Sequence, residues 1–181
     1  MLCRLIGVNP FDQPDVEAAK VAARAALADP APADSAESDV RSGDRADIAS
    51  ELARLRGEVP AGGYLAIQAY LDEACTEALG RLRDAFAAAW GVPVTLGIGP
   101  RFLHSTGQLH KGGAPIGVYL QLLDAPTELA IPHSDAGFAT LIAAQARGDR
   151  EVLRERGRPV LALRSADAAG LIERIRGALA R

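Results

Sequence analysis

YLAIQAYLDEACTEALGRLRDAFAAAWGVPVTLGI, residues 64–98, is the stretch that decides the fold. Residues 64–71 alternate in the manner of a half-buried strand. Residues 73–90 repeat apolar side chains every three or four positions, which is the spacing of an amphipathic helix, and Gly91 follows as a stop signal. Residues 93–98 are strand-like again. The stretch therefore predicts a strand, a helix and a second strand in succession.

The residues that follow continue this alternation. In chain order they predict a strand, two helices, a strand and a last helix at residues 116–123, 138–147, 150–156, 159–164 and 166–180. We expect Gly148-Asp149 to separate the two middle helices. From residue 64 the order β-α-β-β-α-β-α matches a βαββαβ-like, ferredoxin-like split βαβ sheet with an added helix, and a parallel α/β sheet is the alternative. In both cases the class is α/β (α+β), with helices packed on the sheet.

The N-terminal quarter of the chain has a different composition. Residues 2–8 (LCRLIGV) are apolar enough for a buried strand, and a helix is expected to begin near Pro14, a residue suited to the first helical position. Residues 48–56 predict a short helix with Asp47 as its cap. The segment between these helices is rich in Ala, Asp, Ser and Pro, which is typical of a flexible linker. The expected organisation is a strand–helix segment, a linker and an α+β domain at residues 1–27, 28–47 and 48–181.

Composition narrows the function classes. The chain has 181 residues, 49% of them hydrophobic, and a formal net charge of −3, which argues against broad nucleic-acid binding. Cys3 and Cys75 lack CxxC spacing, so neither a zinc site nor a disulfide framework is indicated. No signal peptide or membrane-length apolar run is visible, and we expect a soluble, cytoplasmic protein.

Lysine is rare among the basic residues. The chain has 18 Arg and only two Lys, Lys20 and Lys111. Lys is a compact donor with a tunable pKa that Arg cannot replace in proton chemistry. The two lysines therefore indicate places where an ammonium group is needed, with chance retention as the alternative.

The first candidate site is NPFDQPDVEAAK, residues 9–20. Gln13 and Lys20 are seven residues apart, so on a helix they lie on one face, roughly 10 Å apart along the axis. A sugar phosphate could place its anion at the helix N-terminus and its ring oxygens near the ammonium group. The alternative is that Gln13 is a cap and Lys20 a solvated surface residue.

The second candidate site is GPRFLHSTGQLHKGG, residues 99–113, expected as a long loop that protrudes from the strand pair 93–98 and 116–123. Its possible anion-binding residues are Arg101, His104, Ser105, Thr106, His110 and Lys111. Flexible glycines and these donors suit phosphate or an acidic partner surface. The alternative is a loop whose polar side chains bind one another. No carboxylate or cysteine lies near the two histidines in sequence, so no metal site is expected.

FDQPDVEAAK resembles the C-terminal signature of glucose-6-phosphate isomerases, Phe-Asp-Gln-x-x-Val-Glu-x-x-Lys. The resemblance implies that Lys20 is an active-site lysine beside the sugar ring oxygen and that Gln13 lies close to the substrate. Many relatives have Trp-Gly or Pro-Gly where this chain has Pro14-Asp15, a departure within the first helical turn.

The second motif, the preceding VTLGI and the later AQARGD and LRERGRPVL resemble the C-terminal extension of a bacterial subgroup of this family. The subgroup includes actinobacterial isomerases and transaldolase-fused isomerases. The resemblance implies no catalytic role for residues 99–113. It makes residues 1–27 the last strand and helix of the isomerase core.

The resemblance also implies that parts of the enzyme lie outside this chain. Family members have two upstream sugar-isomerase domains that supply a glutamate base, a ring-opening histidine and a phosphate loop. We therefore expect a fragment or a split subunit that is inactive alone. With the rest of the core, or a partner chain that supplies it, it would convert glucose 6-phosphate to fructose 6-phosphate in glycolysis and gluconeogenesis, without a metal or organic cofactor. The alternative is a non-catalytic phosphosugar-binding or assembly module. The oligomeric state stays open, a homo-oligomer included.

Overall fold

The computed structural model describes residues 2–9, 11–28, 39–41, 45–125 and 127–180. Its centre is a parallel sheet in which the four longer strands lie in the order β5-β4-β2-β3, and short β1 pairs with β5 at the edge. The strands are β1 (Asp39–Arg41), β2 (Tyr64–Tyr70), β3 (Val94–Ile98), β4 (Gly117–Leu123) and β5 (Val160–Arg164). The α/β class is confirmed, but the ferredoxin-like split βαβ arrangement is wrong: every strand pair is parallel, so the alternative, a parallel α/β sheet, is present.

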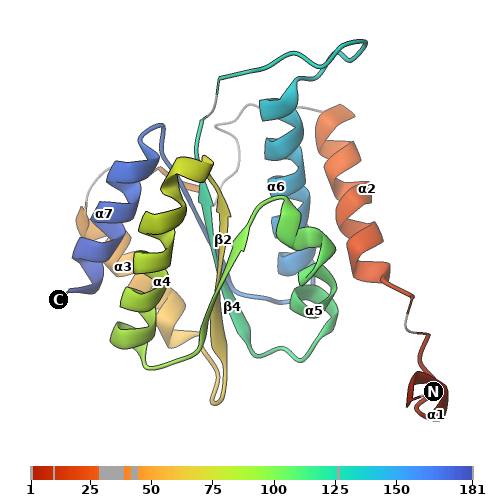
Figure 1. Cartoon of the computed structure of the whole chain (residues 1–181). Helices are drawn as coiled ribbons and strands as arrows, with labels where there is room; N and C mark the ends of the chain where they lie inside the picture. Colours follow the sequence, from red (N-terminus) through yellow and green to blue (C-terminus); the bar gives the residue numbers. More distant parts are fainter. Residues whose placement is uncertain (1, 10, 29–38, 42–44, 126, 181) are drawn as a thin grey trace.

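Helices cover both faces of this sheet. One face carries α3 (Arg45–Gly57), α4 (Thr76–Trp90) and α7 (Ala168–Leu179), and the other carries α5 (Gly107–Gly112) and α6 (Phe138–Glu155). Helix α2 (Pro14–Ala28) lies on the outer side of α6, and the short N-terminal helix α1 (Leu2–Leu5) precedes it (Figure 1). Two 3-10 turns, η1 (Glu73–Cys75) and η2 (Arg101–His104), follow β2 and β3.

The two faces of the central strands differ in polarity. On β2, Leu65, Ile67 and Ala69 belong to the large apolar core shared with α3, α4 and α7. The alternate residue Gln68 is fully buried on the opposite face, as is Gln121 of the neighbouring strand β4. Alternation along a strand sends successive side chains to opposite faces. The face under α5 and α6 therefore holds buried amides where the other face is entirely apolar.

Two expectations about secondary structure are wrong. Residues 2–8 were expected as a strand, but Leu2–Leu5 is helical and its leucines are exposed, because no strand among the described residues lies beside it to pair. Residues 138–156 were expected as two helices, yet α6 continues through Gly148. An isolated glycine is tolerated within a helix when packing requires its small size.

The expected linker at residues 28–47 is described only in part. Residues 29–38 and 42–44 lie outside the described residues. Within the remainder, Asp39–Arg41 pairs in parallel with β5, and α3 already begins at Arg45. The helix start at Pro14 and the left-handed stop at Gly91 (φ 68°) agree with the sequence pattern.

Candidate functional site: a groove between α2, α5 and α6

Helix α2 lies unusually close to α6. The buried side chains along its docked face include Ala19 and Ala23, and they meet Gly148 of α6. A Cβ atom at Gly148 would lie 2.6 Å from the backbone nitrogen of Ala23 and 2.8 Å from the carbonyl oxygen of Ala19. Small residues on both helices thus let the two backbones approach.

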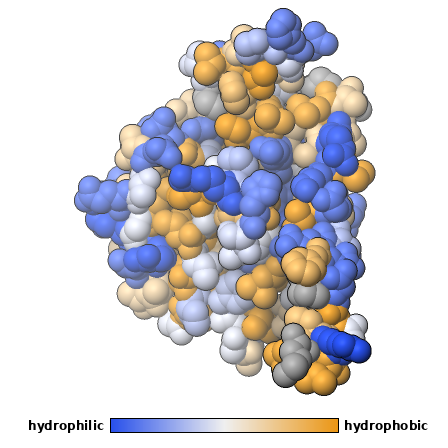
Figure 2. Space-filling model, turned by 45° about the vertical axis from the view of Figure 1, so that its right-hand side comes forward, coloured by the Kyte–Doolittle hydropathy of each residue, from blue (hydrophilic) through white to orange (hydrophobic). Residues whose placement is uncertain are grey.

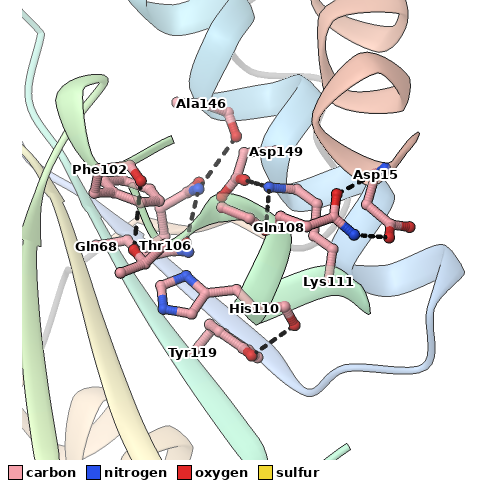
Figure 3. Close-up of polar contacts among 12 residues, drawn as sticks. Asp15, Gln68, Phe102, Thr106, Gln108, His110, Lys111, Tyr119, Ala146 and Asp149 are labelled. Carbon is pink, nitrogen blue, oxygen red and sulfur yellow. Dashed lines mark hydrogen bonds and ion pairs between the residues drawn. The ribbon is translucent and has the colours of Figure 1, made fainter. Parts of the chain in front are cut away.

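A polar clasp fixes the start of α2. The backbone N–H of Asp15 donates to Gln108 Oε1 at 3.1 Å, and Gln108 Nε2 donates back to Asp15 Oδ2 at 2.7 Å. The other carboxylate oxygen of Asp15 pairs with Arg156 at 2.5 Å. Asp15 is only 4% exposed, and its carboxylate contacts both Gln108 of α5, as Figure 3 shows, and Arg156 at the C-terminal end of α6.

Polar side chains at the start of α2 stay exposed beside the docked face. Gln13, Glu17 and Lys20 are all exposed, and the Lys20 ammonium donates to Glu17 Oε1 at 2.6 Å. This hydrogen bond and the Lys20 charge lower the pKa of Glu17. Lys20 and Gln13 therefore share the accessible side of one helix, as their spacing predicts.

The expected anion cluster of residues 99–113 does not form. Strands β3 and β4 are not neighbours, because both pair with β2, so the segment between them crosses the face of the sheet under α6 instead of protruding as a hairpin. Arg101 is exposed and pairs with Glu73, whereas Lys111 is buried and pairs with Asp149. The 3-10 turn and α5 point these cations in different directions, and each has its own carboxylate.

The remaining residues of this motif have structural partners. The hydroxyls of Ser105 and Thr106 both donate to the carbonyl oxygen of Phe102, which closes the turn. His110 is buried, and its backbone carbonyl accepts from the Tyr119 hydroxyl at 2.8 Å. Burial, with a smaller contribution from the Lys111 charge, lowers the pKa of His110 to about 4. His110 is therefore neutral near pH 7 and carries no charge for an anion.

Lys111 and Asp149 form a buried ion pair between the sheet and α6 (Figure 3). Burial raises the pKa of Asp149, and the Lys111 charge opposes that rise. Around the pair, Arg150 donates to Gln121 Oε1 at 2.6 Å, and Gln121 donates to a backbone carbonyl of α6 at 3.1 Å. Sequence analysis missed this network. Its sequence signals are the scarcity of lysine, which singled out Lys111, and the pair of amides, Gln68 and Gln121, in otherwise apolar strands.

A groove of about 260 Å³ opens between α2, the η2–α5 segment and α6. It brings together Lys20 from the first motif and His104 and Lys111 from the second, so both lysines of the chain line one cavity. The full lining is Val16, Ala19, Lys20, Ala23, Arg24, Leu27, Leu103, His104, Lys111, Leu141 and Gln145. The other expected site residues, namely Gln13, Arg101, Ser105, Thr106 and His110, lie outside it.

Helix N-termini are the usual backbone sites for phosphate, and those of η1, α6 and α7 are occupied by the chain's own carboxylates. Asp72 accepts from the backbone of η1, and Asp167 accepts from Gly170 in α7, each at 2.8 Å. Glu128 accepts from two backbone N–H groups at the start of α6, at 2.8 and 3.1 Å. A carboxylate at these positions satisfies the free donors and repels a second anion.

Two further kinds of site are absent from the described ranges. No group of three or more His, Cys, Asp or Glu side chains there is arranged to hold a metal ion. None of the described helices combines the length and the apolar composition that a membrane crossing requires.

Comparison with known proteins gives a fold and no family. No family model matches the chain, and no curated protein matches it. Among solved structures, the crystal structure of a hypothetical protein from Thermus thermophilus, TT0462, is similar, with a TM-score of 0.60 and 20% sequence identity. The match covers 92% of this chain and 44% of the Thermus chain, so this chain spans less than half of that protein's length. At this identity the likeness establishes a shared α/β fold.

Proposed function

We propose that this chain is the C-terminal part of a glucose-6-phosphate isomerase and supplies α2, with Lys20, to an active site that other segments complete. The observation that carries the proposal is the division of α2 and the residues before it into two sides. Five of the six signature residues are exposed, namely Phe11, Asp12, Gln13, Glu17 and Lys20. The sixth, Val16, is buried with the docking positions Asp15, Ala19 and Ala23, which lie outside the signature. The fold thus attaches α2 while leaving the polar signature residues accessible.

In this proposal two of the exposed residues, Lys20 and Gln13, have a chemical task. The Lys20 ammonium would polarise the ring oxygen as the sugar opens, and the Gln13 amide would hold the substrate. Isomerisation then moves a proton between two carbons, and that step needs a carboxylate base in position. The family resemblance assigns that base to an upstream domain and not to Glu17, which is paired with Lys20 at 2.6 Å. The chain alone is therefore expected to be inactive.

Exposed apolar side chains around α1 support the proposal that another segment packs against this chain. Leu2, Leu5, Ile6, Val8 and Phe11 are all at least half exposed, and Phe11 reaches 89%. In Figure 2 this apolar surface lies at the lower right, at the end of the molecule where Figure 1 places the N-terminal segment. A contiguous apolar patch of this kind is typical of an interaction surface. In the proposal it packs against the rest of the isomerase core.

A second candidate is an assembly module without catalytic residues. The carboxylate caps on η1, α6 and α7 favour it for these three elements, because they leave none of their N-termini open to a phosphate group. They disfavour the phosphosugar-binding version of that alternative.

Complementation separates the two candidates. The full chain is mixed with a polypeptide that carries the two sugar-isomerase domains of a relative, and conversion of glucose 6-phosphate is followed. We expect no turnover from either piece alone, turnover from the mixture, and its loss with Lys20→Ala. The matched control is Arg81→Ala, which also removes an exposed helical cation paired with a glutamate, in this case Glu77. A complex that forms without turnover would reject the enzyme proposal and leave the assembly module.

A further inference from the structure

The groove between α2, α5 and α6 has an apolar interior. Six of its eleven lining residues are aliphatic: Val16, Ala19, Ala23, Leu27, Leu103 and Leu141. A sugar needs a polar partner for nearly every hydroxyl, because a buried hydroxyl without a hydrogen bond is costly. This interior offers too few such partners for a sugar, so it suits an aliphatic group instead.

The charged side chains of the groove are all basic. Lys20, Arg24 and His104 lie on its exposed rim, and no Asp or Glu is among the lining residues. Lys111 lies at the floor but is already neutralised by Asp149. Arg24 makes no hydrogen bond or ion pair within the described part of the chain, and the only such partner of Lys20 there is the exposed Glu17. The rim therefore attracts an anion, and among the described residues only the exposed Glu17 acts on its cations.

We propose that this groove binds a small organic anion with an aliphatic body, such as a medium-chain carboxylate. The body lies along the six aliphatic side chains, and the carboxylate lies at the rim between Lys20 and Arg24. The volume of about 260 Å³ equals that of eight or nine water molecules at about 30 Å³ each, so the ligand is compact. The site needs only described residues of this chain and does not depend on the isomerase proposal.

The geometry also predicts a consequence for α2. A ligand in this groove contacts α2 on one side and Leu103 and Leu141 on the other, so it joins the helix to the domain. It also competes with Glu17 for the Lys20 ammonium. Binding would therefore hold α2 in its docked position while it occupies the lysine.

Titration with octanoate tests the proposal. The full chain is labelled with ¹⁵N, and amide shifts are followed on addition of octanoate, 1-octanol or inorganic phosphate. We expect one saturable site for octanoate, with shifts confined to α2, residues 101–112 and the first half of α6. Octanol should bind more weakly at the same place, and phosphate should cause no matching shifts. Shifts confined to α3, α4 and α7, unsaturable shifts, or an equal response to phosphate would each overturn the proposal.

Two variants sharpen this test. Arg24→Ala removes a rim cation that makes no hydrogen bond or ion pair with a described residue, and should weaken octanoate binding roughly two- to five-fold while leaving octanol unchanged. Arg83→Ala is the control, because it removes an exposed cation of α4 on the opposite face of the sheet. Leu27→Ala should weaken octanoate and octanol together, because it shortens the apolar wall. Equal effects of Arg24→Ala and Arg83→Ala on octanoate would refute the assigned position of the carboxylate.

Discussion

Replacing Gly148 by alanine tests how α2 is held on the domain. The new Cβ would lie 2.6 Å from the backbone nitrogen of Ala23, about 0.8 Å short of ordinary van der Waals contact at 3.4 Å. The two atoms nearest to the new Cβ, Ala23 N and Ala19 O, are backbone atoms of α2, so the whole helix has to move. Overpacking of this kind costs about 1–3 kcal/mol, whereas alanine in a helix interior gains about 1 kcal/mol over glycine.

Gly80→Ala in α4 is the matched control. A Cβ there has no neighbour within 4 Å, so only the helix gain of about 1 kcal/mol applies. The two variants should therefore differ by about 1–3 kcal/mol in the free energy of unfolding measured with urea. Hydrogen exchange should show the loss from Gly148→Ala chiefly in the amides of α2. Equal stabilisation by both variants, with unchanged exchange in α2, would refute the close approach of α2 and α6.

Three further changes test the buried polar groups and the clasp. Lys111→Met should lower the free energy of unfolding by about 3–5 kcal/mol, because it leaves Asp149 buried without its partner. Adding Asp149→Leu should recover part of this loss. A loss below about 1 kcal/mol from Lys111→Met alone would contradict the buried pair. The pKa of His110 is about 4 in the folded state and 6.5 in the unfolded state, so its contribution to stability is complete above pH 6.5 and is lost as the pH falls toward 4. NMR titration of the His110 ring should give a midpoint well below 6. A midpoint near 6.5 would contradict its burial. Arg156→Ala should loosen the start of α2 and speed exchange at Val16 without slowing or speeding exchange in β4, and an unchanged rate at Val16 would show that the clasp contributes nothing.

The elements of the sheet were predictable because their signals are local. The strand at residues 64–71, the helical spacing of 73–90 and the stop at Gly91 depend only on near neighbours, and these elements are present. The half-buried character expected of the strand is wrong, because helices cover both faces of the sheet and bury six of the seven residues of β2. The direction of the strands was not predictable from the same signals. Whether β4 pairs with β2 or with β3 is decided by the packing of distant helices, so the pattern left two sheets open.

The site was less predictable because its residues meet through tertiary contacts. Lys111 and Asp149 are buried together although 38 positions separate them. Gly148 is typical of a helix break by its residue type, but its close contact with α2 explains why a glycine stands inside α6. Proximity in sequence misled in the opposite direction. Arg101 and Lys111 are ten residues apart, yet the turns between them carry one to the surface and the other to the core.

The exposed apolar segment at residues 2–8 shows a third limit. Its composition favours a buried strand, but a strand needs a partner, and none of the described strands lies beside it. Local propensity therefore yields to the absence of pairing. In the complete isomerase that we propose, this segment would pack on the missing core, and its exposed leucines are the signal of that requirement.

Turnover of the complemented enzyme with Lys20→Arg tests the central claim most directly. Arginine keeps the charge and the helix but changes the shape and the proton chemistry of the group, so a lysine at the sugar ring cannot be replaced by it. The account predicts a large fall in kcat with unchanged assembly and unchanged unfolding free energy, while the reverse exchange on α4, Arg81→Lys, leaves kcat as it was. Full turnover by Lys20→Arg would contradict the claim that α2 delivers Lys20 to the active site.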